Sequence, residues 1–78
     1  MFHGMEQNPT ERTAATVRAE VARARAKTTD LARVLGLSRT TVWRRLTGEY
    51  PFNVAELDAL ASHLGVPVST FFDDRQAA

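Results

Sequence analysis

LARVLGLSRTTVWRRLTG is the sequence of residues 31–48, and each of its two glycines follows a segment of helical character. On both sides of Gly36, apolar residues recur three and four positions apart, which is the spacing of one face of a helix. Gly36 suits the position after a helix because it adopts a positive φ without strain. Ser38 is a favoured N-cap residue, so a new helix is expected to begin directly after it. The stretch therefore predicts two helices joined by a tight turn, an arrangement that lets the second helix protrude.

The remaining sequence is also predicted to be helical, because no segment alternates apolar and polar residues over a useful length. Thr10 is the expected N-cap of the first helix, and Asn53 forms a capping box with Glu56 at the start of the fourth. Phe71 or Phe72 is expected to fill the core from a last turn. The expected helices cover residues 10–26, 28–35, 39–47 and 54–64, and the last turn covers 69–73.

Length and composition limit the chain to one domain. It has 78 residues, 44% of them hydrophobic, and no cysteine, so disulfides and thiolate metal sites are excluded. It shows neither a signal peptide nor an apolar run of the roughly 18 residues that a membrane span needs. We expect a cytoplasmic protein without membrane contact, with a flexible N-terminal arm at 1–9, a domain at 10–74 and a C-terminal tail at 75–78.

Charge is distributed unevenly along the chain, although the net charge is only +1. Residues 11–45 hold nine of the ten basic side chains and three acidic ones, whereas residues 46–78 hold one basic and five acidic side chains. A basic half of this kind favours an anionic partner, and nucleic acid is the commonest one for an arginine-rich surface. The alternative is a solvated charged face without a partner.

The helix after Ser38 separates two kinds of side chain. Val42 and Leu46 are expected to point into the core, whereas the opposite side carries Arg39, Thr40, Trp43 and Arg44. The major groove of DNA is about 12 Å wide and admits one helix, arginine bonds guanine bidentately, and threonine suits thymine. These types of side chain predict base reading, chiefly by Arg44, against the alternative of a solubilising surface.

Trp43 is the single tryptophan of the chain, and a lone tryptophan in a small domain is usually a core residue. Its spacing from Val42 and Leu46 argues against the core and directs it partly toward Arg39 and Thr40. We expect a partly buried side chain that packs against the sugar-phosphate backbone or lies under Arg39.

Catalytic and metal-binding patterns are weak in this sequence. His3 and His63 are the only histidines, too few for a metal cluster or a catalytic dyad, and N-capping explains several of the hydroxyl side chains. The sequence predicts no enzyme, no cofactor, no metal ion and no small-molecule ligand.

Several of these residues resemble a known family. Leu31-Ala32, Gly36, Ser38, Val42 and Gly48 resemble the helix-turn-helix of the lambda-repressor-like (Cro and XRE) family, and ELDALASHLGVPVSTFF at 56–72 resembles its fourth and fifth helices. The likeness covers about residues 17–73. It implies a compact five-helix bundle that binds double-stranded operator DNA, usually as a homodimer.

The resemblance also implies which residues touch DNA. Arg39, Thr40 and Arg44 stand where the family contacts bases. The positions at or near backbone contacts are Thr28, Ser38, Thr41 and Trp43, and Thr28 replaces a phosphate-binding glutamine of many members. Backbone amides near Asn53 are a further candidate phosphate site, because the helix dipole favours anions there.

Besides Thr28, the chain departs from the family at four positions. Val21 and Leu46 occupy the positions of an arginine–glutamate ion pair in many relatives, so an apolar contact is expected there. Arg45 replaces an apolar residue and is expected to lie along the core with its charged end in water. Glu49 stands in a loop that is often basic in relatives, which predicts fewer phosphate contacts and weak binding by one copy.

The expected function is therefore sequence-specific DNA binding for transcriptional control, as a repressor without a ligand-sensing domain. A bare domain of this type is associated with phages and mobile elements. Homodimerisation is expected to double the base contacts, with Phe71 or Phe72 supplying an apolar patch. The alternative is a protein-interaction module of the same fold, such as an antirepressor or an antitoxin-like partner; an acidic recognition helix would favour it, whereas Arg39 and Arg44 favour DNA.

Overall fold

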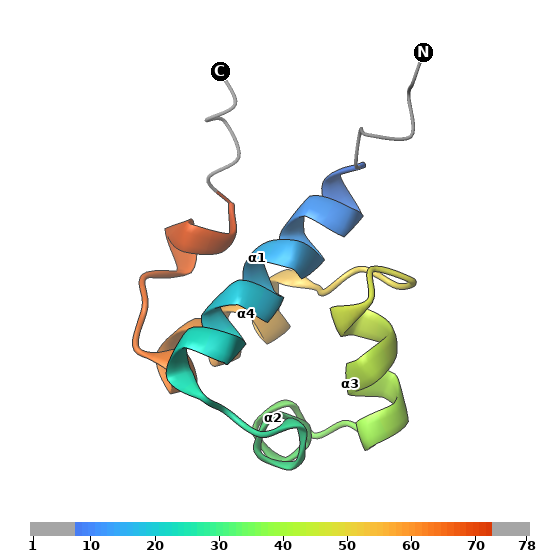
Figure 1. Cartoon of the computed structure of the whole chain (residues 1–78), viewed down its shortest axis with the longest axis vertical. Coiled ribbons are helices and arrows are strands. Elements are labelled where there is room, and N and C mark those ends of the chain that lie inside the picture. Colours follow the sequence, from blue (N-terminus) through green and yellow to red (C-terminus); the bar gives the residue numbers. More distant parts are fainter. Residues whose placement is uncertain (1–7, 73–78) are drawn as a thin grey trace.

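The computed structural model describes residues 8–72 and is helical throughout its regular structure (Figure 1). The α-helices are α1 (Pro9–Ala24), α2 (Thr28–Leu35), α3 (Arg39–Leu46) and α4 (Val54–Leu64), and a 3-10 helix, η2 (Val68–Phe71), follows them. This confirms the all-α prediction. Residues 1–7 of the arm expected at 1–9 and the residues from 73 onward, including the tail at 75–78, lie outside the described residues.

The expectation of five helices is wrong in its last member, because η2 is a single 3-10 turn of four residues. Pro67 precedes it and no side chain caps it, so nothing supports an α-helical start, and short helical segments of this kind commonly take the tighter form. The turn is enough to bring Phe71 into the core, where it is 3% exposed, whereas Phe72 remains 49% exposed.

The start of α1 differs from the prediction. Asn8, not Thr10, is the N-cap: its side chain accepts a hydrogen bond from the Glu11 amide at 2.8 Å, and Glu11 accepts one from the Asn8 amide. Pro9 at the first helical position has a φ already suited to the helix, which favours the earlier start. Pro9, which the sequence analysis placed in the arm, is therefore the first residue of α1, and Asn8 is its N-cap. The expected starts of α2, α3 and α4 are confirmed.

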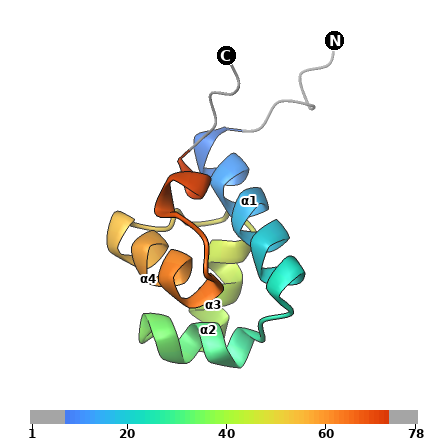
Figure 2. The same ribbon diagram turned by 90° about the vertical axis from the view of Figure 1, so that its left-hand side faces the viewer.

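The core draws one or more side chains from every helix. Figure 2 shows α2 lying across one end of the bundle, while the start of α1 and η2 lie at the other end. The buried cluster consists of Val17, Leu31, Val42, Leu57, Leu60, Ala61 and Phe71. Val21 and Leu46, the positions of the missing ion pair, both pack against this cluster as apolar side chains.

Helix α3 packs against α1 and α2 but not against α4. Val42 is its one fully buried residue, and its Cα atoms stay more than 8 Å from those of α4. Arg45 spans this gap: its Nε and Nη2 donate to the two carboxylate oxygens of Glu56 at 3.1 and 3.3 Å. The expectation that the charged end of Arg45 stays in water is wrong, because the half-buried carboxylate of Glu56 lies within its reach.

Arg18 of α1 provides a second polar attachment. Its guanidinium donates to the carbonyl oxygen of Leu46 at 2.5 Å, which satisfies one of the carbonyls left free at the end of α3. Close by, Gly48 adopts φ +87° and comes so near α1 that an added Cβ would lie 3.3 Å from the Glu11 side chain. The last turn of α3 is thus fixed against α1 by Arg18 and by a glycine that permits close approach.

Arg25, at the C-cap of α1, is the one non-glycine among the described residues with positive φ, at 56°. We expect Arg25→Gly to raise the free energy of unfolding by about 0.5 to 1 kcal/mol, because glycine adopts this conformation without the strain of a Cβ. Urea denaturation measures the change. Arg25→Ala is the matched control, since it removes the same side chain but keeps the strain; an equal gain in both variants would contradict the explanation.

Glu56 both caps α4 and binds Arg45, so its replacement should affect two helices. We expect Glu56→Ala to lower the free energy of unfolding by about 2 kcal/mol, because a half-buried guanidinium loses its partner and the capping box is broken. Glu56→Gln should lose about half as much, since glutamine keeps the cap. Urea titrations measure these losses, and the exposed Glu49→Ala variant is the control with the same charge change. If Glu56→Ala loses no more stability than Glu49→Ala, the proposed role of Glu56 is wrong.

Candidate nucleic-acid interface

The outward side of α3 carries the side chains that the sequence assigned to DNA. Arg39, Thr40, Trp43 and Arg44 are all exposed, whereas Val42 is buried. Thr47, directly after the helix and three residues beyond Arg44, is exposed as well. The orientation predicted from helical periodicity is confirmed, and no described segment of the chain covers this side.

The turn before α3 sets this orientation. Gly36 closes α2 with φ 68°, and its amide donates to the carbonyl oxygens of the last turn of α2. Ser38 then caps α3 as predicted: its Oγ accepts a hydrogen bond from the Thr41 amide at 3.1 Å and donates to the Thr41 hydroxyl at 3.0 Å. The hydroxyls of Ser38 and Thr41 therefore have a structural partner at the start of α3, next to the exposed Arg39.

A shallow hollow of about 410 Å³ lies between the first residue of α2 and the outward side of α3. Thr28, Arg39, Thr40 and Trp43 line it. Trp43 is 61% exposed, so it lies outside the core, and its partial burial agrees with the expectation from its spacing. Seven of the eight residues predicted to touch DNA thus lie on α3, at its N-cap or at the adjoining start of α2.

Six arginines of the domain differ in whether their side chains already have a partner. Arg23, Arg33 and Arg45 pair with Glu20, Asp30 and Glu56, and Arg18 bonds the end of α3. The hydrogen bond from Arg33, 2.7 Å long, holds the pKa of the Asp30 carboxyl below its ordinary value. Among residues 8–72, no carboxylate or carbonyl oxygen accepts a hydrogen bond from the side chain of Arg39 or Arg44. Those two cations remain open to an external anion or acceptor.

Asn53, the eighth predicted residue, lies apart from this group at the N-cap of α4. Its side chain accepts from the Glu56 amide at 2.7 Å, and its own amide donates to the Glu56 carboxylate at 3.0 Å. A carboxylate therefore already bonds the amide of Asn53, and its negative charge opposes a phosphate at this position.

Two exposed residues near the interface, Thr47 and Tyr50, were not predicted from the sequence. Tyr50 is 48% exposed, and its amide donates to the Arg44 carbonyl oxygen at 3.4 Å, which places its backbone beside the end of α3. Thr47 continues the row of Thr40 and Arg44 at helical spacing, so periodicity alone was sufficient to find it. Tyr50 carries no such signal, because its position depends on the path of the loop after Gly48.

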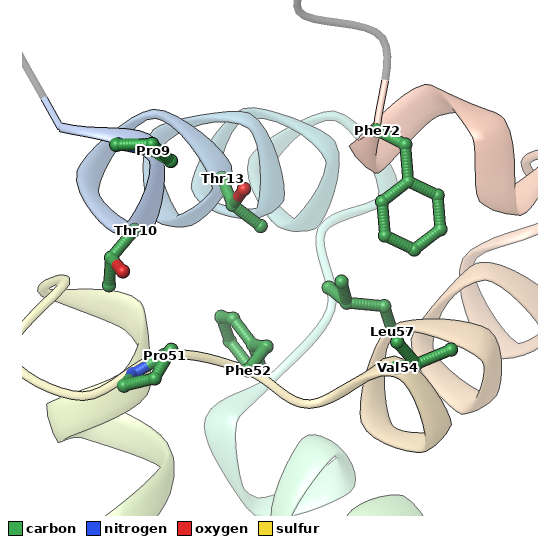
Figure 3. Close-up of a pocket in the computed structure, with 8 residues that line it drawn as sticks. All are labelled: Pro9, Thr10, Thr13, Pro51, Phe52, Val54, Leu57 and Phe72. Atoms are coloured by element: carbon green, nitrogen blue, oxygen red, sulfur yellow. The ribbon is translucent and has the colours of Figure 1, made fainter.

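A second hollow, of about 200 Å³, is apolar and lies away from α3. Figure 3 shows Phe52, Leu57 and Phe72 around it, with Thr10 and Thr13 of α1 on its other side. Val54 at its rim is exposed. Phe72, which is 49% exposed, is one of the residues that line this hollow.

Metal and membrane features can be searched only in the part of the chain that the structure describes. There, no three His, Cys, Asp or Glu side chains gather into a potential metal site. None of the described helices has both the length and the apolar character needed to cross a membrane.

A helix that follows a glycine turn and presents open arginines on its outward side defines a helix-turn-helix-like DNA-binding domain. The chain belongs to the BetR domain family, which matches residues 9–78 and is a family of small helix-turn-helix-like DNA-binding domains. A comparison with curated proteins finds no match. Family and fold together give the chain a DNA-binding, regulatory role.

Proposed function

We propose that the chain is a sequence-specific transcriptional repressor that acts in the cytoplasm on double-stranded operator DNA, related to the lambda-repressor-like (Cro and XRE) proteins. The single observation that supports this most is the open outward side of α3, with Arg39 and Arg44 exposed and bonded to no described residue. The proposal assigns the chain no catalytic reaction, cofactor or small-molecule ligand.

In this proposal α3 lies in the major groove, where some side chains contact bases and others contact phosphates. Arg44 bonds the O6 and N7 atoms of a guanine, and Thr40 and Arg39 contact neighbouring base edges. Thr28, Ser38 and Thr41 lie at the starts of α2 and α3, where backbone amides and hydroxyls suit phosphate oxygens. Asn53 is a weaker phosphate contact, because Glu56 already bonds its amide.

The proposal includes a homodimer on DNA. One copy offers few base contacts, and Glu49 and Glu56 reduce the positive potential near the loop after α3. Phe71 cannot supply the dimer contact because it is buried, whereas Phe72 and Val54 are exposed beside the apolar hollow. A second copy seated there would double the number of base contacts.

The second candidate function is a protein-interaction module of the same fold, such as an antirepressor or antitoxin-like partner. The apolar hollow around Phe52 and Phe72 favours it, since such surfaces bind proteins. Against it, the exposed residues of α3 include no acidic side chain that would mimic or repel DNA. Binding of duplex DNA by the isolated chain decides between the two candidates.

Arg44→Ala tests the proposed base contact. After selection of a binding site from random duplex DNA at fixed salt, we expect this variant to lose about 1 to 3 kcal/mol of binding free energy and to relax specificity at one base pair. Fluorescence anisotropy on the selected site and its single-base variants measures both effects.

Arg33→Ala is the matched control, because it removes the same charge from an exposed arginine that pairs with Asp30. We expect a small loss, equal for all DNA sequences. Equal losses in Arg44→Ala and Arg33→Ala, uniform over the single-base variants, would mean that charge alone binds DNA and that α3 does not read the groove.

Phe72→Asp tests the dimer. We expect the unchanged chain to bind its site as two copies and Phe72→Asp to bind as one, because a carboxylate disrupts an apolar contact. Analytical ultracentrifugation of the protein with and without the DNA site gives the stoichiometry, and Ser62→Asp on the exposed surface of α4 is the control. A single copy of the unchanged chain on DNA would refute the homodimer.

A further inference from the structure

Trp43 has a large apolar ring on the surface where the other exposed side chains are polar or charged. It is 61% exposed, and it is the only tryptophan of the chain. Leaving so much apolar surface in water is unfavourable, by roughly 25 cal/mol for each Å² that a partner could cover. Since the described chain does not cover the ring, the position is one where an external apolar group would be bound.

The residues around Trp43 indicate which kind of external apolar group the ring would bind. The ring shares its hollow with Arg39 and Thr40, the two side chains at the start of α3 proposed to contact base edges, and with Thr28 of α2. Thr40 lies three residues before Trp43 on the helix surface and lines the same hollow, so we refer to its methyl group and the indole together as one apolar strip. Arg39, four residues before Trp43, and Arg44, the next residue, place a cation on either side of this strip.

The major groove offers one apolar group on its base edges, the 5-methyl group of thymine. We propose that the strip of Trp43 and Thr40 reads this methyl group, and that the binding site therefore contains a thymine next to a guanine bonded by Arg39 or Arg44. The inference rests on the proposed function of the outward side of α3. It gives Trp43 a part in base specificity, whereas the sequence analysis expected the ring on the sugar-phosphate backbone or under Arg39.

Replacing thymine by deoxyuridine removes the methyl group and leaves every hydrogen-bonding atom of the base pair in place. In the selected duplex, exchanged one thymine at a time, we expect one position at which the unchanged chain loses about fivefold in affinity, the worth of one buried methyl group. Trp43→Ala should bind the thymine and deoxyuridine duplexes equally. The emission of Trp43, the single tryptophan, should shift to shorter wavelength on the thymine duplex and less on the deoxyuridine duplex.

Tyr50→Ala is the control, because it removes another exposed aromatic ring at the end of α3. It should keep the fivefold preference for thymine, and so should Trp43→Phe in part. Circular dichroism checks that the variants remain folded; because Trp43 is exposed, its replacement should not disturb the core.

The outcomes separate the two proposals. If the unchanged chain binds its site through Arg44 but tolerates deoxyuridine at every position, the thymine inference is wrong and the proposed function stands. In that case a uniform loss in Trp43→Ala assigns the ring to the deoxyribose. If the chain binds no duplex DNA at any sequence, both the proposed function and this inference are wrong.

Discussion

The attachment of α3 determines what this domain can present to a partner. An isolated helix of eight residues is not stable in water, and Val42 is the one fully buried residue of α3. Leu46 also packs against the core, and two arginines add polar restraints: Arg18 bonds the carbonyl oxygen of Leu46, and Arg45 reaches Glu56 of α4. Because these bonds lie on the inward side and at the end of the helix, Arg39 and Arg44 are left facing outward in one defined orientation.

Local signals predicted most of the fold. Gly36, Ser38 and the Asn53–Glu56 capping box act within a few residues, and the structure places the ends of α2, α3 and α4 where these signals put them. The bond between Arg45 and Glu56 was not predictable in the same way, because it joins two helices and depends on the gap that separates them. The last element was expected from the same kind of local signal, but without a side-chain cap it forms only a 3-10 turn, which still brings Phe71 into the core.

The sequence predicted the orientation of α3 more reliably than it predicted the positive charge available to DNA. Periodicity alone identified which side of α3 is exposed. The excess of basic residues at 11–45, in contrast, overstates the field available to DNA, because Arg45 is paired with Glu56, a carboxylate outside that range. Sequence counts every cation, whereas the structure shows which cations already have a partner. A protein whose open arginines are concentrated on one helix depends on where that helix is placed more than on its net charge.

Glu56 connects stability with recognition. It holds α3 through Arg45 and caps α4, but it also places a carboxylate where a phosphate would otherwise bind the start of α4. Binding to phosphates is independent of sequence and weakens with salt, so fewer such contacts lower the affinity for all DNA alike. Base contacts from α3 are unaffected by this loss. On the proposed function, few phosphate contacts therefore lower the affinity of a single copy for all DNA, and the ratio of specific to non-specific binding depends on how α3 is placed against the base edges.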